Sequence, residues 1–210
     1  MTVTRRAVLG GGAGLGIVAL GGIGLSRFLR SSAPDADVHA VLFDLDQPVL
    51  GNPQGDVTVA EFFDYQCPFC KRGHDDLMAE VEADGNLRLI MKDWPIFGGA
   101  SVIAAQMVLG GVASDDYLGA QAALMATPAR LSEDDVRSTL SAAGLDPDAL
   151  LGAYGRDRAR WDGMLGRNAQ QAAGLGLQGT PAFIVERTIH AGAMDRTALR
   201  RAIAAARATA

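Results

Sequence analysis

Cysteine, aromatic residues and positive charge are all scarce in this sequence. Its 210 residues include only two cysteines, aromatic side chains make up 6%, and the net charge is -5. Two cysteines cannot form the several disulfide bonds that hold together small secreted proteins. The negative charge argues against nucleic-acid binding through a general excess of basic residues. With 49% hydrophobic residues the chain can bury a core, and we expect one folded domain of about 170 residues.

Beyond residue 25, the sequence also lacks an apolar run of the roughly 20 residues that a membrane-spanning helix needs. At the N-terminus, by contrast, Arg5 and Arg6 precede an uncharged, glycine-diluted stretch from Ala7 to Leu25. This pattern predicts an export signal of the twin-arginine type or, without cleavage, a membrane anchor. Small residues near Val38 and Ala40 suit signal cleavage. Both alternatives place the rest of the chain on the oxidising side of a bacterial membrane.

The two cysteines lie three residues apart, in the stretch EFFDYQCPFCKRGH that runs from Glu61 to His74. A disulfide between Cys67 and Cys70 would close a very short loop, so it would remove little chain entropy from the unfolded state. The pair is therefore better explained by chemistry than by structural cross-linking. Disulfide exchange and metal binding are the two chemistries that such a pair supports.

The residues around the cysteines change from strand periodicity to helix periodicity. Both alternating faces of Val57 to Tyr65 are largely apolar, which predicts a buried central strand. After Cys67, core-type residues recur at helical spacing, and Pro68 suits a first helical turn. We expect this helix to close near residues 84–86. The alternating stretch from Leu87 to Lys92 then predicts a second strand, which completes a βαβ unit.

Cys67 falls at the predicted start of this helix. Unpaired N–H groups and the helix dipole stabilise a thiolate there, and Lys71 and Arg72 add positive charge nearby. We therefore predict that Cys67 is the attacking thiol, with its pKa lowered from about 8.5 to between about 3.5 and 7.5. Cys70 lies one turn further and faces the core. We expect it to be less exposed and to resolve mixed disulfides.

A later sequence completes a recognisable pattern. The sequence Gly179-Thr180-Pro181 precedes an apolar strand, Ala182 to Glu186, and together with the earlier βαβ unit it resembles the thioredoxin fold. The sequences EFFDYQCPFCKR and KDWPIFG resemble the DsbA family of bacterial envelope thiol–disulfide oxidoreductases, and the resemblance runs from about Val41 to the C-terminus. It implies an α/β protein, a thioredoxin-like fold with an inserted helical subdomain, and an enzyme that exchanges disulfides.

The resemblance also implies roles for residues near the cysteines. Glu61, six residues before Cys67, resembles a buried acid that relays protons to the second thiol, and burial should raise its pKa. The alternative is a strand-edge glutamate that reaches solvent. Thr180–Pro181 resembles a cis-proline element that packs against the disulfide and offers its backbone to an extended substrate. We assign Pro68 and Phe69 to the same substrate site, and the resemblance implies no cofactor.

These patterns divide the chain into four segments. They are a leader with a short polar tether, the first half of the thioredoxin fold, a helical insertion, and the second half of the fold: residues 1–40, 41–98, 99–175 and 176–210.

Turn and capping signals predict some boundaries in the last two segments. Ser132 and Asp135 form a capping box, and Gly174 fits a helix end. Residues 188–192 are expected to form a hairpin with the preceding strand. Its loop at Glu186–Arg187 lacks the glycine or asparagine of tight hairpins, so we expect a wider loop. Asp195 is expected to cap the last helix.

His74 leaves a second class of function open. It lies four residues after Cys70 on the same helical face, so the two cysteines and His74 could hold copper or zinc in a metal-delivery protein. A core histidine with a satisfied hydrogen bond is the alternative. Metal ligation needs neither Glu61 nor Thr180–Pro181. We therefore favour the redox enzyme and assign no metal site.

The expected partners follow from the resemblance and from the leader. We expect the substrates to be unfolded or newly exported proteins with cysteines, and a membrane redox partner to reset the disulfide. Isomerases that resemble this fold have an N-terminal oligomerisation segment, whereas Ser26 to Ala40 shows no heptad or amphipathic pattern. We therefore expect a monomeric oxidase in the periplasm or cell envelope. Thr180 before the proline is the one feature that favours an isomerase.

Overall fold

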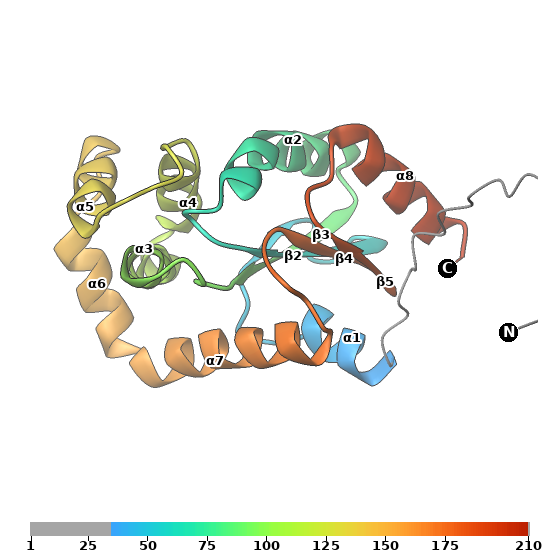
Figure 1. Ribbon diagram of the computed structural model, residues 1–210, viewed down its shortest axis with the longest axis horizontal. Helices are drawn as coiled ribbons and strands as arrows, with labels where there is room; N and C mark the ends of the chain where they lie inside the picture. Colours follow the sequence, from blue (N-terminus) through green and yellow to red (C-terminus); the bar gives the residue numbers. More distant parts are fainter. Residues whose placement is uncertain (1–34, 210) are drawn as a thin grey trace, which may run out of the picture.

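The computed structural model describes residues 35–209, so the leader predicted in residues 1–34 lies outside the described range. A five-stranded mixed sheet runs through the middle of the molecule (Figure 1). Strands β2 and β3 are parallel, and the other neighbouring pairs are antiparallel. In spatial order, the strands are β1 (Val49–Gly51), β3 (Leu87–Asp93), β2 (Val57–Phe63), β4 (Ala182–Val185) and β5 (Thr188–Ala191).

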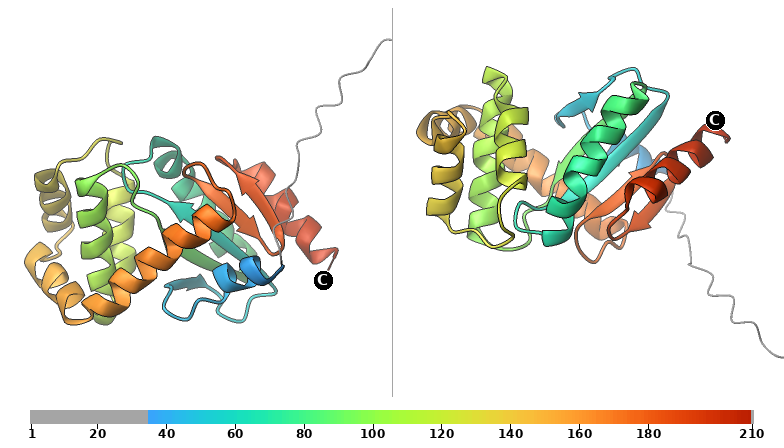
Figure 2. Two further views of the ribbon diagram at one scale, coloured as in Figure 1. Left: turned by 60° about the horizontal axis from the view of Figure 1, so that its bottom comes forward. Right: turned by 90° about the horizontal axis from the view of Figure 1, so that it is seen from above.

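Helices cover both faces of this sheet. On one face lie α2 (Pro68–Asp84) and α8 (Arg196–Arg207), and on the other lie α1 (Asp35–Leu42) and α7 (Arg158–Gly174) (Figures 1 and 2). A group of helices stands beside one end of the sheet. Its members are α3 (Gly99–Gly110), the 3-10 turn η1 (Gly111–Ser114), α4 (Tyr117–Met125), α5 (Glu133–Ala142) and α6 (Pro147–Arg156).

The central strand explains how the active segment is placed. All seven residues of β2 are buried, as the apolar character of both its faces predicts. Val59 and Phe63 pack on the α2 side, in a core that continues into the helices beside the sheet, whereas Phe62 packs on the α1 and α7 side. The parallel β2–α2–β3 unit confirms the predicted α/β class and thioredoxin-like arrangement. Glu61 therefore shares the face of the sheet that α2 covers.

The prediction of a polar tether up to residue 40 is wrong in its last part. Residues 35–42 form α1, and its Val38 and Val41 are 3% and 0% exposed. Both valines pack with Phe62 and Ile90 on the α7 side of the sheet. Cleavage near Ala40 would remove Val38 from this core. The folded body therefore begins by Asp35, where α1 starts, rather than at Val41.

The structure confirms two helix starts and one helix end. Ser132 and Asp135 form the expected capping box, and the Asp195 side chain accepts a hydrogen bond from the N–H of Ala198. Helix α7 ends at Gly174, as predicted, and Gly176 in the loop that follows has a left-handed backbone at φ 68°. None of the helices within residues 35–209 has the length and apolar character that crossing a bilayer requires.

The β4–β5 hairpin is tighter than expected. Val185 pairs directly with Thr188, and Glu186 adopts a φ of 48°. This left-handed conformation normally favours glycine or asparagine. Here the N–H of Glu186 donates to the Thr58 carbonyl oxygen at 3.0 Å, and the Glu186 carboxylate accepts from the Thr58 N–H. These two contacts with the neighbouring strand hold a turn that the local sequence does not favour.

Candidate active site

Cys67 is the N-cap residue of α2, with Pro68 as the first residue of the helix. Its backbone is extended, at φ -74° and ψ 116°, so its sulfur points back at the helix start. The N–H of Cys70 donates to Cys67 Sγ at 3.4 Å. The sulfur therefore takes the place of the side-chain oxygen that usually caps a helix. A negative charge on this atom faces unpaired N–H groups and the positive end of the helix dipole.

The surroundings of Cys67 favour its thiolate. A hydrogen bond from the Cys70 thiol is the largest effect, and burial opposes it. The Thr180 side chain and the backbone N–H groups of Cys70 and Phe69 also favour the thiolate. Together they lower the pKa of Cys67 to about 5. The predicted lowering is confirmed. At pH 7 this thiol is mostly ionised, as an attacking sulfur should be.

Cys70 has the opposite character. Burial, the hydrogen bond with Cys67 and the nearby Glu61 raise the pKa of its thiol, in that order of size. Cys70 therefore holds its proton while Cys67 is ionised. The expected difference in exposure is wrong, because both cysteines are 1% exposed in the reduced protein. Exposed surface does not separate the two thiols: burial dominates at Cys70, whereas hydrogen bonds at the helix start outweigh burial at Cys67.

Glu61 is buried in the middle of β2, with 2% of its surface exposed. Its Oε2 atom has no hydrogen-bond partner. Burial, and then the charge of Cys67, raise the pKa of Glu61 to about 8. The alternative of a glutamate that reaches solvent is therefore excluded. At pH 7 this carboxyl is mostly protonated, and once it is ionised its charge raises the pKa of Cys70.

The loop before β4 lies against Cys67. The Thr180–Pro181 peptide bond is cis, and Cys67 Sγ lies 3.2 Å from the Thr180 carbonyl oxygen. Strand β4 pairs with β2, and Phe183 is the register partner of Glu61. Pro181 is buried, whereas Phe69 is 53% exposed. The sheet thus brings residues more than 100 positions apart to one place.

Asp64 is a structural element of the site that sequence reasoning missed. It is 1% exposed, and four groups donate hydrogen bonds to its carboxylate. The donors are the Gln66 N–H at 2.7 Å, the Ser101 hydroxyl at 2.6 Å, and the N–H groups of Ile96 and Phe97 at 2.7 and 3.1 Å. Asp64 therefore ties the segment before Cys67 to the WPIFG segment. The resemblance of this segment to the DsbA family did not itself predict a physical role for it.

The two basic residues after Cys70 differ in position. Lys71 Nζ donates to the Leu124 carbonyl oxygen and, at 2.7 Å, to the Thr127 hydroxyl, at the end of α4. Burial lowers the pKa of Lys71 to about 8. The Arg72 guanidinium instead lies over the Phe69 ring, 4.4 Å from its centre. Lys71 therefore joins α2 to the helical insertion, and Arg72 shapes the exposed surface.

His74 is a buried core histidine, as the alternative to a metal site predicts, and one of its ring nitrogens has no hydrogen-bond partner. It is 5% exposed, its Nδ1 has no partner, and burial lowers its pKa. Within residues 35–209, no group of three or more His, Cys, Asp or Glu side chains is arranged to hold a metal ion. The metal alternative built on His74 and the two cysteines therefore has no structural support.

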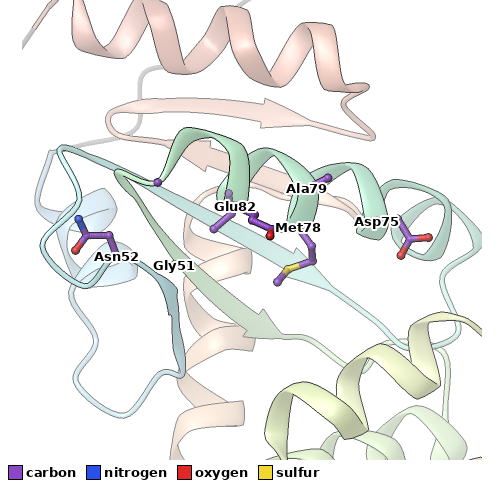
Figure 3. A pocket seen from close by; sticks show the side chains of 8 residues that line it. Gly51, Asn52, Asp75, Met78, Ala79 and Glu82 are labelled. Atoms are coloured by element: carbon purple, nitrogen blue, oxygen red, sulfur yellow. The ribbon is translucent and has the colours of Figure 1, made fainter.

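A surface depression of about 600 Å³ lies away from the cysteines, between α2 and β1 (Figure 3). Asp75, Met78 and Glu82 line its α2 side, and Gly51 and Asn52 line its β1 side. Neither cysteine reaches it. It combines acidic and apolar groups without a buried polar group pointing inward, so it adds nothing to the chemistry of the dithiol centre.

A stable thiolate next to a buried, protonated thiol is the arrangement of a thiol–disulfide oxidoreductase, in which the first sulfur attacks and the second resolves. A family model described as Thioredoxin matches residues 44–205. The chain belongs to this family.

Three solved structures are similar to this chain. A thioredoxin-like oxidoreductase from Silicibacter pomeroyi DSS-3 is 35% identical, covers 82% of this chain and 98% of its own, and has a TM-score of 0.77. The thiol-disulfide exchange protein alpha-DsbA2 from Wolbachia pipientis is 25% identical, with 81% and 94% covered and a TM-score of 0.74. A periplasmic thioredoxin-like protein from Salmonella enterica serovar Typhimurium is 26% identical, with 81% and 96% covered and a TM-score of 0.68.

A curated relative matches over a shorter stretch. Disulfide bond formation protein D of Bacillus subtilis (strain 168) is 47% identical over 38 residues, which are 18% of this chain and 17% of that protein. The family and the three structures support a general role in thiol–disulfide exchange.

Proposed function

We propose that this protein oxidises the cysteines of exported proteins in the bacterial cell envelope. The observation that carries the proposal is the pKa of Cys67, lowered to about 5. A stable thiolate stabilises the reduced protein and so makes the disulfide a stronger oxidant. At pH 7 the effect is at most about 3 kcal/mol, or about 60 mV, relative to a thiol with an ordinary pKa.

The proposed reaction begins with attack on Cys67. A substrate thiolate forms a bond with Cys67 Sγ, the Cys67–Cys70 bond breaks, and its electron pair stays on Cys70. The buried Cys70 sulfur is a poor site for a charge, so it takes a proton from the Glu61 carboxyl. A second substrate thiolate then attacks the substrate sulfur of the mixed disulfide. The substrate leaves with its new disulfide, and Cys67 leaves as a thiolate.

Substrate binding involves the surface around Cys67. The cis Thr180–Pro181 segment lies against the sulfur and offers backbone groups to an extended chain. Pro68 and the exposed Phe69, which follow Cys67 in the chain, add an apolar surface. Unfolded proteins expose apolar side chains, so such a surface suits them better than it suits folded partners.

The location and the partners are part of the same proposal. The similar Salmonella protein is described as periplasmic, which supports an envelope location. We propose export by the twin-arginine route through Arg5 and Arg6, a monomeric body, and a membrane redox partner that reoxidises the dithiol. Replacing both arginines by lysine should block export. Normal delivery of that variant to the envelope would exclude the route and leave the enzymatic proposal unaffected.

A disulfide isomerase or reductase is the second candidate. Thr180 precedes the cis proline, and this residue favours an isomerase. Both activities use the same exchange steps, since Cys67 can also attack a substrate disulfide. A low pKa favours release of Cys67 over accumulation of mixed disulfides, which suits oxidation.

A pair of assays with the full-length protein separates the two candidates. One follows reoxidation of reduced, unfolded ribonuclease, and the other follows reactivation of scrambled ribonuclease. The proposal predicts fast oxidation and poor isomerisation. Reactivation of the scrambled substrate as fast as oxidation of the reduced one would overturn the oxidase assignment. Failure in both assays would overturn the proposed function itself.

A further inference from the structure

Three exposed apolar side chains lie in segments next to the dithiol centre. Within residues 35–209, six large hydrophobic side chains are exposed, and three of them are Phe69 at 53%, Ile96 at 42% and Phe97 at 52%. Phe69 stands between the two cysteines, and Ile96 and Phe97 lie in the connection from β3 to α3. Single exposed apolar residues need no explanation, but a group of them beside a reactive site does.

The connection from β3 to α3 runs along the segment that leads into the dithiol. Strands β2 and β3 are parallel, so both segments leave the sheet at the same end (Figure 1). The Trp94 N–H donates to the Phe63 carbonyl oxygen at 2.9 Å. The N–H groups of Ile96 and Phe97 donate to the Asp64 carboxylate, at 2.7 and 3.1 Å. The backbone that carries the two exposed side chains is therefore fixed to the segment after β2.

Gln66, directly before Cys67, completes this attachment. Its Nε2 donates to the Phe97 carbonyl oxygen at 3.2 Å and to the Ser101 hydroxyl at 3.0 Å, and its Oε1 accepts from the Leu131 N–H at 3.0 Å. Neighbouring Cα atoms are about 3.8 Å apart, and a glutamine side chain reaches about 5 Å. The Phe97 carbonyl oxygen therefore lies within about 12 Å of the Cys67 Cα atom.

A glycine fixes the chain on the far side of the exposed pair. Gly98 is the N-cap of α3 and has φ 104° and ψ -166°, a conformation that only glycine adopts readily. Ile96 and Phe97 are thus held by their backbone while their side chains remain in water. A partner that binds such prearranged apolar groups loses little free energy to ordering them. Rigid, exposed apolar side chains are therefore suited to recognition.

The partner that meets this surface is the chain whose cysteine reacts. Thiol–disulfide exchange brings a substrate sulfur to bonding distance from Cys67 Sγ, so the residues around that sulfur pass over the neighbouring surface. An extended chain advances about 3.3 Å per residue. Residues up to about four positions from the substrate cysteine therefore reach Phe97.

We propose that Ile96 and Phe97 form a substrate contact that selects chains with a bulky apolar side chain within about four residues of the reacting cysteine. The inference rests on the proposed function, because its partner is the chain that Cys67 oxidises. It also names a substrate class. Cysteine and bulky apolar residues are the ones that folded proteins most often bury, so the selected sites are those that are accessible only before the substrate folds.

The test compares two reduced peptides as substrates of the full-length protein in its disulfide form. Each peptide carries two cysteines joined by a glycine–serine linker. The positions two residues before and after each cysteine are Phe in one peptide and Ser in the other. Stopped-flow measurement over a range of peptide concentrations gives the rate at low concentration, the half-saturating concentration and the limiting rate.

The wild type should prefer the Phe peptide. We expect it to react on the order of tenfold faster at low concentration, which is equivalent to about 1.4 kcal/mol. The gain should come from a lower half-saturating concentration and not from a higher limiting rate, because the contact binds the chain and takes no part in the exchange of sulfurs.

Replacing both side chains, in the variant Ile96→Ser with Phe97→Ser, should remove the preference. The ratio of the two rates should fall to about twofold or less, because the apolar surface is gone. Reaction with dithiothreitol, which has no side chains, reports on the dithiol centre alone and should stay within about twofold of the wild type. Phe43→Ser is the matched control. It removes an aromatic side chain of similar exposure, 47%, from the segment after α1, and should keep the preference.

Phe97→Leu distinguishes an apolar contact from a structural role. It keeps an apolar side chain and should keep most of the preference, whereas Phe97→Ser alone should lose most of it. Equal losses in these two variants would overturn the inference. So would a large loss of the dithiothreitol rate in the double variant, because the segment would then serve the dithiol centre and not the substrate.

The wild-type rates separate this inference from the proposed function. If the wild type oxidises both peptides equally fast, or if the preference survives in the double variant, the inference alone fails. The surface would then belong to another partner, such as the membrane redox partner, or the preference to Phe69. If the wild type reacts with dithiothreitol but oxidises neither peptide, the proposed function fails, and the inference falls with it.

Discussion

Lys92 and Asp93 are neighbours in β3, and their side chains lie on opposite faces of the sheet with different surroundings. Lys92 is 0% exposed, on the α7 side, where its Nζ lies 3.9 Å from Asp44 Oδ2. Arg167 also binds Asp44, at 2.9 Å, and Asp46, at 2.6 Å. On the α2 side, Asp93 and Glu61 are buried without a positive partner.

The difference separates a face that serves stability from one that serves chemistry. On the α7 side, opposite charges hold the segment after α1 against β3 and α7, and Arg167 contributes to lowering the pKa of Asp44. On the α2 side, the raised pKa of each carboxyl keeps it protonated near neutral pH. An unpaired buried acid is a cost to the fold, but a paired one could not donate a proton.

The largest expected effect is a loss of activity from changes on the α2 side of the sheet. Cys67→Ser should abolish dithiol oxidation, because it removes the sulfur that the substrate attacks. Cys70→Ser should leave a reactive Cys67 that accumulates mixed disulfides, since nothing resolves them. Mass spectrometry after incubation with a reduced substrate and glutathione disulfide measures the adducts. Full turnover by Cys70→Ser would contradict the resolving role.

Substitutions on the α7 side of the sheet, where the charges are paired, should change stability and leave activity unchanged. Asp44→Asn leaves Lys92 buried without its partner and should lower the free energy of unfolding by about 3 kcal/mol. Its matched control is Asp46→Asn, at a side chain that is 35% exposed, where we expect a loss below about 1 kcal/mol. Guanidinium unfolding measures both, and the disulfide exchange rate should not change. Equal losses in the two variants would contradict the comparison.

Glu61→Gln should shift stability in the opposite direction. The folded-state pKa of Glu61 is about 8, above that of the unfolded chain, so the wild type loses stability as the pH rises from about 4 to 8. The glutamine variant lacks this loss. It should be more stable by about 3 kcal/mol at pH 7 and nearly unchanged at pH 4, while it oxidises dithiols more slowly. A variant less stable than the wild type at pH 7 would indicate a structural glutamate.

The smallest expected effect is on how steeply the reduction potential of the disulfide falls with pH. Above pH 5, Cys67 is reduced to a thiolate and only Cys70 takes up a proton, so reduction consumes one proton for two electrons. The reduction potential should fall by about 30 mV per pH unit between pH 6 and 7, compared with about 59 mV for two protons. Equilibration with glutathione buffers measures it. The steeper slope would mean that Cys67 is protonated in this range.

Much of the site could be predicted from local sequence. The apolar faces of Val57 to Tyr65 and the helical period after Cys67 place both cysteines at a strand-to-helix junction, and the same pattern predicts the burial of Glu61. These are short-range signals of period and capping. The sequence distance between Cys67 and Thr180 shows no such signal, so their proximity came from the resemblance alone.

The remaining features depend on tertiary contacts. Asp93 ends a strand beside a lysine, and nothing local distinguishes it from a solvated residue. In the fold it is 1% exposed, with Asp64 and Tyr65 of the segment after β2 close to it. Helix α1 was missed because only Val38, Val41 and Leu42 of its short, mixed sequence are buried, against the sheet. The tight turn at Glu186 depends on contacts with Thr58 in another strand.

The most direct test of the account is the pKa of Cys67 in the reduced protein. It can be measured from the ultraviolet absorbance of the thiolate as a function of pH, with the Cys67→Ser variant as the blank. The account predicts a midpoint at about 5, with Cys70 remaining protonated throughout the neutral range. A midpoint near the ordinary thiol value of about 8.5 would contradict it, because neither the thiolate nor the oxidising disulfide would then be favoured.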